Sequence, residues 1–141
     1  MRILLYTMFL ALLSFGSAAR AEPVVVVSAA SAIGQLSHDE VVNIFLGRYR
    51  SLPSGGMAVP IDQPENAAIR AEFYRRLVNK NINEINAYWA RLVFSGKTAP
   101  PRQVDSATGF FQLLMASPDA IGYVDRSQVD RRLRVVLEFP Q

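Results

Sequence analysis

The hydrophobic and polar positions of residues 36–47 predict a short amphipathic helix. Ser37 and Glu40 are three residues apart, which is the spacing of a capping box at a helix start. Apolar residues then recur at positions that share one helical face. Gly47 follows the last of them, where a residue with a left-handed backbone commonly ends a helix. We therefore expect a helix packed on a core, followed by a loop that carries two arginines.

The rest of the chain alternates between strand-like and helix-like segments. Four apolar runs predict strands, and they are residues 24–27, 57–62, 121–124 and 133–139. Helical spacing of apolar residues predicts helices over residues 65–78, over residues 83–94, and from a cap at Asp105 or Ser106 to Met115. Pro60 limits its strand to a sheet edge or stands at a strand end. The interleaving predicts an α/β fold, with a small central β-sheet flanked by helices.

The first 21 residues have the pattern of a cleaved signal peptide. Arg2 is followed by an apolar run over residues 3–15, and small residues surround the end of the segment at Ala21. The run is shorter than the roughly 18 residues that a membrane-spanning helix needs. We expect cleavage after Ala21, so that residues 22–141 form a single domain.

Charge and cysteine content narrow the class of protein. The 15 basic and 12 acidic residues become 13 and 12 when Arg2 and Arg20 are lost with the signal peptide. The remaining net charge of about +1 gives no general attraction to nucleic acid. The sequence has no cysteine, which excludes disulfides, a thiolate nucleophile and a lipid-bearing cysteine after the signal. We expect a protein released into the periplasm, with no stable membrane insertion after cleavage.

The residues give no sign of catalytic chemistry. His38 is the only histidine, and in the first turn of a predicted helix we expect it to be solvated. Ser28 and Ser31 have no histidine or lysine at a recognisable spacing that would activate them. Three acidic residues are predicted to be surface charges rather than a paired-carboxylate site: Asp62, Glu65 and Glu72. The sequence therefore predicts no enzyme, no metal site and no cofactor.

Four short motifs follow one another along the chain. They are Leu36-Ser37-x-x-Glu40-Val41-x-x-Ile44-Phe45-Leu46-Gly47-Arg48, Arg70-x-x-Phe73, Tyr88-Trp89, and Pro118-Asp119-Ala120-Ile121-Gly122-Tyr123-Val124. In this order they resemble the phosphate-binding family of substrate-binding proteins that serve ABC uptake transporters. The resemblance implies the fold of one lobe of a type II periplasmic binding protein. It also implies a binding module in phosphate transport as the function.

The resemblance further implies a place for the ligand. Members of the family hold their oxyanion at a helix start, with a Ser-Gly-Thr motif that follows an arginine. Alignment on Phe73 places the Ala-Ala-Ile of residues 67–69 at that motif and Gln63 near the arginine. The candidate ligand-binding residues are Gln63, Asn66, Ala67, Ala68, Ile69 and Arg70. Because the hydroxyls are replaced and Asp62 adds a carboxylate, we expect weak or altered binding of a small phosphate-like anion.

An interaction protein is the alternative function. Its partner would be a membrane sensor or transporter, or a second copy of the chain in a homodimer that completes a two-lobed cleft. Tyr88 and Trp89 are predicted to lie in the core, with an exposed aromatic patch for a partner as the alternative. Two loops carry four basic residues, which either converge into one basic patch or remain separate solvated charges: Arg48, Arg50, Lys97 and Arg102.

Overall fold

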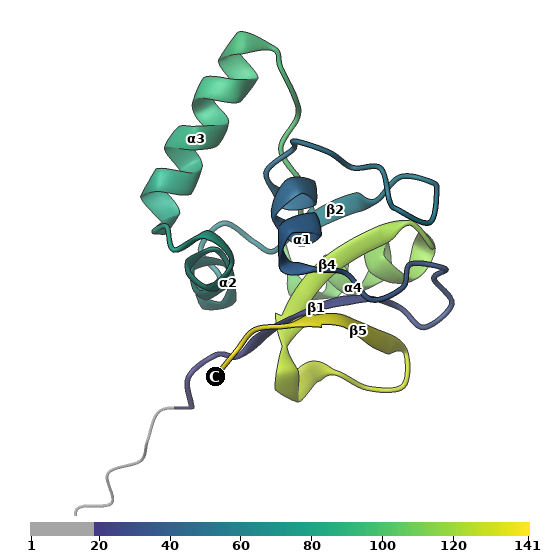
Figure 1. The fold of residues 1–141 in the computed structure, drawn as a ribbon. Helices are drawn as coiled ribbons and strands as arrows, with labels where there is room; N and C mark the ends of the chain where they lie inside the picture. The colour runs from purple at the N-terminus through teal and green to yellow at the C-terminus, as the bar shows by residue number, and fades with distance from the viewer. Residues whose placement is uncertain (1–18) are drawn as a thin grey trace, which may run out of the picture.

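The computed structural model describes residues 19–141, which form a five-stranded mixed β-sheet with helices on both faces (Figure 1). In chain order the elements are β1 (Pro23–Ser28), α1 (His38–Phe45), β2 (Val59–Asp62), α2 (Ala68–Val78), α3 (Ile82–Ser95), β3 (Arg102–Gln103), α4 (Ala107–Ala116), β4 (Ala120–Asp125), the 3-10 turn η1 (Arg126–Gln128) and β5 (Leu133–Glu138). The predicted α/β fold is confirmed. The predicted signal peptide lies almost entirely in residues 1–18, outside the described residues.

The strand order in the sheet is β3-β2-β4-β1-β5. β1 pairs antiparallel with both β4 and β5, and Val26 lies opposite Gly122 of β4. β2 pairs parallel with β4 on one side and with β3 on the other. The first apolar run of the domain therefore lies inside the sheet, next to the strand that the fourth motif forms.

The core has two parts because β1 is covered on both faces. Val25 and Val27 belong to the larger cluster, which α1, α2 and α3 close from one side. Val24 and Val26 belong to a second cluster, which α4 closes from the opposite side. Figure 1 shows α1 in front of the sheet and α4 behind it. A continuous apolar run is the expected sequence of a strand that is buried on both faces.

The helix starts follow the sequence signals closely. Ser37 and Glu40 form the predicted capping box, with the Glu40 N–H 3.2 Å from Ser37 Oγ and the Ser37 N–H 2.7 Å from Glu40 Oε2. Ser106 rather than Asp105 caps α4, since its hydroxyl accepts from the Gly109 N–H at 3.0 Å. The predicted break between the second and third helices is at Asn79, which adopts a left-handed backbone.

Two element boundaries and one short strand differ from the sequence prediction. α2 begins at Ala68, three residues after the predicted start, because residues 64–67 form a turn closed by the Ala67 N–H and the Pro64 carbonyl. β2 begins at Val59, and the two-residue strand β3, which was not predicted, covers its outer side. Pro60 stands near the strand start, where β3 does not reach, since that pairing begins at Ile61. Among residues 19–141, no helix has the length and apolar character needed to cross a membrane.

Candidate binding site at the end of β2

The carboxylate of Asp62 lies at the centre of a buried polar network. The prediction of a surface charge is wrong for this residue, because Asp62 is only 3% exposed. β2 enters the core and ends at Asp62, which brings the carboxylate under α2 and beside β4. A buried carboxylate is stable only when its lone pairs are satisfied by donors. The residues around Asp62 supply those donors.

Four groups donate to the two carboxylate oxygens. Arg70 Nε lies 3.0 Å from Oδ2, and the Tyr74 hydroxyl lies 3.0 Å from the same oxygen. The backbone N–H of Gln63 donates to Oδ1 at 2.9 Å, and the Tyr123 hydroxyl donates to Oδ1 as well. This donor set resembles one that a protein uses to hold an oxyanion. Here the oxyanion is the protein's own side chain.

Helix geometry and ring packing place the donors. Arg70 and Tyr74 are four residues apart on α2, so both side chains project from the same face toward β2. Tyr123 comes from the centre of β4, and its ring stacks on Phe73 with centroids 3.8 Å apart. The side chain of Gln63 is also held by β4, because its amide Nε2 donates to the Tyr123 carbonyl at 2.8 Å. The network is therefore tied to the core on three elements.

Burial and the Asp62 charge set the ionisation of this network. Burial raises the pKa of Tyr74 and of Tyr123 well above the ordinary value of 10, and the nearby charge of Asp62 raises both further. Burial alone lowers the pKa of Arg70, but the charge and hydrogen bond of Asp62 outweigh it, so the pKa of Arg70 lies above its ordinary value. Both phenols therefore remain proton donors and Arg70 remains a cation at physiological pH.

A pocket of about 190 Å³ opens onto this network. Its lining comprises Asp62, Arg70, Asn86, Trp89, Pro100, Pro101 and Gln103. Asn86 of α3 accepts from both terminal nitrogens of Arg70, each at 3.3 Å. Arg70 thus donates three hydrogen bonds to protein acceptors of the five that a guanidinium can make, which leaves two N–H groups. The buried indole N–H of Trp89 has no acceptor among the described residues.

The predicted ligand-binding residues separate into two groups. Gln63 and Arg70 both belong to the buried network, where their polar groups are engaged by Tyr123, Asp62 and Asn86. Residues 66–69 do not line the pocket. They lie at the start of α2, where Ala67 is the cap residue and gives no side-chain hydrogen bond. The start of α2, where the resemblance placed the anion, therefore has no side-chain hydrogen bond from its cap residue.

The two basic loops converge in part. Arg50 Nη2 donates to the Ala99 carbonyl at 2.6 Å, so the loop after α1 lies against the loop after α3. Gly47 also lies against the loop after α3, since a Cβ at this position would be 2.9 Å from the side chain of Thr98. Arg102 lines a different hollow, at the start of α4. Burial lowers the pKa of Arg50.

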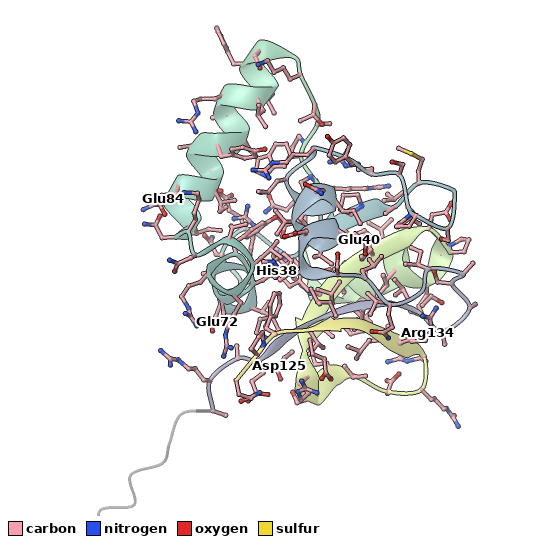
Figure 2. All side chains as sticks on the ribbon, viewed as in Figure 1. His38, Glu40, Glu72, Glu84, Asp125 and Arg134 are labelled. Carbon is pink, nitrogen blue, oxygen red and sulfur yellow. The ribbon has the colours of Figure 1, made fainter. Side chains whose placement is uncertain are left out.

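Of the other residues that the sequence analysis considered, His38 and Glu65 are exposed, Glu72 is partly buried, and Ser28 and Ser31 are buried. Glu72 pairs with two arginines of its own helix, Arg75 and Arg76, and His38 is the first residue of α1 (Figure 2). Glu65 is exposed as predicted. Within residues 19–141, no three His, Cys, Asp or Glu side chains are grouped closely enough to hold a metal ion.

Sequence reasoning missed the residues that complete the site from distant segments. Tyr123 was assigned to a strand motif, and Asn86 was not singled out at all, although both contact the Asp62–Arg70 pair. Asp62 and Arg70 are eight residues apart and belong to different elements, so no helical spacing connects them. The spacing of Arg70 and Tyr74 was the one available signal, since residues four apart on a helix share a face.

No family model matches the sequence. No curated protein matches it either.

Solved structures of phosphate-transport binding proteins have a similar fold. A phosphate ABC transporter substrate-binding protein from Clostridium perfringens, with bound phosphate, aligns with a TM-score of 0.63 and 16% identity over 82% of this chain and 44% of that one. An ABC-type phosphate transport receptor from Vibrio cholerae aligns with a TM-score of 0.63 and 14% identity over 82% and 45%. PstS from Borrelia burgdorferi aligns with a TM-score of 0.60 and 12% identity over 86% and 49%.

The chain thus spans less than half the length of each of these proteins. At this level of identity the likeness is one of fold. The fold of the described residues is similar to that of one lobe of these phosphate-transport binding proteins.

Proposed function

We propose that the chain is an exported binding module whose pocket beside Arg70 takes a small polar ligand and binds phosphate weakly or not at all. The observation that carries this proposal is the internal pair of Asp62 and Arg70 at the pocket. The fold likeness to binding proteins supports a binding role. The Asp62 carboxylate accounts for the expected weak binding of phosphate, because it already neutralises the charge of the Arg70 guanidinium.

Charge at the pocket favours a ligand with little negative charge. Asp62 and Arg70 together contribute no net charge, and the other lining residues are neutral. A phosphate dianion would approach the Asp62 carboxylate without a free cation to offset the repulsion. A neutral molecule or a monocarboxylate can accept hydrogen bonds from the two remaining Arg70 donors and from Trp89.

Calorimetry on the folded domain tests the proposal. Phosphate and sulfate are titrated into the domain in one series, and small monocarboxylates, amides and polyols in a second series. We expect binding from the second group, and its loss in Asn86→Leu, which fills the pocket from α3. Asn83→Leu is the matched control, because Asn83 is exposed on the same helix and does not line the pocket. Micromolar or tighter phosphate binding would contradict the proposed ligand class.

Export is the second part of the proposal. The supporting observation is the sequence pattern of residues 1–21, since the described fold begins only at Pro23 with β1. Expression of the full chain in a Gram-negative host is expected to give a periplasmic protein whose intact mass corresponds to a first residue of Glu22. A cytoplasmic product that retains Met1 would contradict export by this route.

A membrane transporter or sensor as protein partner is the second candidate function. A groove of about 520 Å³ between α2 and α3 favours it, since the lining includes apolar Ala71 and Ile82 and charges of both signs. Mixed polar and apolar lining is typical of surfaces that bind proteins. A photo-crosslinker at Ala71 in intact cells is expected to capture such a partner, and one at Arg131 is not. Equal yields from both positions would contradict a partner in this groove.

The homodimer stays a prediction. Light scattering on the purified domain measures it directly, and a monomeric mass at high concentration would exclude it.

A further inference from the structure

The C-terminal end of α3 presents large apolar side chains to solvent. Phe94 is 95% exposed and Val93 is 54% exposed, and both lie in the last turn of the helix. Figure 1 shows this end of α3 standing away from the sheet. Tyr49, on the loop after α1, is also 67% exposed, but it lines a separate hollow with Glu40 and Asn43. Large exposed apolar side chains that lie close together commonly mark a contact surface.

The end of α3 is held in a defined conformation. Gly96 has a left-handed backbone, and its N–H donates to the Val93 carbonyl at 3.1 Å. The Lys97 N–H returns to the Leu92 carbonyl at 3.3 Å, which closes the helix end. Four residues before Leu92, the Tyr88 hydroxyl donates to the Leu46 carbonyl at 2.7 Å and fixes α3 to the end of α1. Phe94 is therefore displayed by a rigid support.

The charged residues that flank this end of α3 and the loop after α1 in the sequence are all cations. Between Glu84 and Asp105 the charged residues are Arg91, Lys97 and Arg102, and between Glu40 and Asp62 they are Arg48 and Arg50. None of these five forms an ion pair with another residue in the described part of the chain. The acidic residue of α3, Glu84, lies at the opposite end of the helix, as Figure 2 shows. The α3 end is thus apolar at its tip and positively charged around it.

We propose that this α3-end surface, consisting of Arg91, Val93, Phe94 and Lys97, docks reversibly on an anionic phospholipid surface. Aromatic side chains partition into the headgroup region, and nearby cations add attraction to anionic lipid. The surface is a projecting helix end, with Val93 and Phe94 in its last turn. A lipid surface can deform around such an end, which favours lipid over an acidic protein. The proposal is independent of what the pocket beside Arg70 binds.

Vesicle sedimentation tests this with residues 22–141, which contain every described helix and strand. The vesicles are equal parts phosphatidylglycerol and phosphatidylcholine, or phosphatidylcholine alone. We expect binding only to the anionic vesicles, weakened by salt because exposed charges are screened. Arg91→Glu with Lys97→Glu is expected to reduce the affinity at least about 25-fold, at about fivefold per lost cation. Phe94→Ser is expected to reduce it about tenfold, from loss of the buried apolar surface.

Matched control variants distinguish binding through this surface from effects of overall net charge and overall hydrophobicity. Lys80→Glu with Arg131→Glu makes the same change in net charge elsewhere, and Met115→Ser removes an exposed apolar side chain from α4. Both are expected to bind as the parent does. The tryptophan fluorescence of Phe94→Trp is expected to shift to shorter wavelength on anionic vesicles. Trp89 is already buried, so the shift would report on residue 94.

Three outcomes of the vesicle experiments would overturn the proposal. They are no binding to anionic vesicles at low salt, equal loss in the control variants, and binding that survives both α3-end variants. Retention of a polyglutamate peptide without vesicle binding would also overturn it and would assign the surface to an acidic protein.

Discussion

Arg70 Nε lies 3.0 Å from Asp62 Oδ2, and the two side chains are only 6% and 4% exposed. The guanidinium is the cation nearest the pocket, and the carboxylate that neutralises it belongs to the same chain. A buried pair of this kind contributes little net stability compared with apolar residues, but removal of one partner leaves a buried charge uncompensated. The pair therefore explains both the expected weak phosphate binding and the sensitivity of the fold to changes at either residue.

Asp62→Asn is expected to lower the free energy of unfolding by about 3 kcal/mol. The change keeps the size of the side chain but removes the charge that compensates Arg70, and breaking such a buried pair typically costs about 3–5 kcal/mol. Chemical denaturation measures the loss. Asp119→Asn, at an exposed turn residue, is the control and should be within about 0.5 kcal/mol of the parent. An Asp62→Asn domain as stable as the parent would mean that the pair is not buried as described.

Gly122→Ala is expected to destabilise the domain by about 1–3 kcal/mol, because a Cβ there would lie 2.4 Å from the ring of Phe110. Gly122 is opposite Val26 in the sheet, so neither β4 nor α4 can move away without loss of pairing or packing. Thermal unfolding followed by circular dichroism gives the comparison. Gly34→Ala is the matched control, since a Cβ at Gly34 has no atom within 4 Å. Similar melting temperatures for the two variants would argue against close packing of α4 on the sheet.

Gly47→Ala is expected to cost more stability than Gly96→Ala. Both glycines have a left-handed backbone, with φ of 71° and 67°, so both variants carry a strain of about 1 kcal/mol. Only at Gly47 would the new Cβ also meet side chains, Trp89 at 2.8 Å and Thr98 at 2.9 Å. The difference in unfolding free energy between the variants measures how tightly α3 and its following loop pack on the end of α1. Equal losses would show that this packing is loose.

Acid is expected to weaken the domain partly through Glu72. Hydrogen bonds from Arg75 and Arg76 lower the pKa of Glu72 from 4.5 to about 2. A lowered pKa in the folded state stabilises the fold above pH 4.5, and this contribution is lost as the pH falls from 4.5 toward 2. Because the arginines are partly exposed, we expect about 1 kcal/mol rather than the full value of the shift.

The measurement for Glu72 is the unfolding free energy of the parent and of Glu72→Gln at several pH values. The difference between them should be present at neutral pH and vanish near pH 2. This comparison isolates Glu72 from Asp125 and Asp130, whose pKa values are also lowered. A difference that stays constant with pH would exclude an ionised pair.

The prediction of the fold succeeded where local signals are strong. The capping box at Ser37 and Glu40 depends on residues three apart, so the sequence contains all of it. The run Val24–Val27 indicates a strand covered on both faces, and the two core clusters confirm that it is. The strand β3 has two residues and no apolar pattern, so it is defined only by its pairing with β2.

The candidate site was predicted only in part, because its chemistry depends on the fold. Gln63 and Arg70 were named from a resemblance, and both are in the network. Asp62 was predicted to be a surface charge because a carboxylate at a strand end usually is one. It is buried because β2 runs into the core and ends where Tyr123 of β4 can reach it.

The sequence alone determined where helices begin, which strands are buried and that the domain is α/β, since these follow from neighbouring residues. The tertiary structure decided that Asp62 and Arg70 form a buried pair, and that the loops after α1 and α3 meet. The physical reason is that ion pairing and surface charge depend on distances between segments far apart in the chain, and only the packed sheet and helices fix those distances.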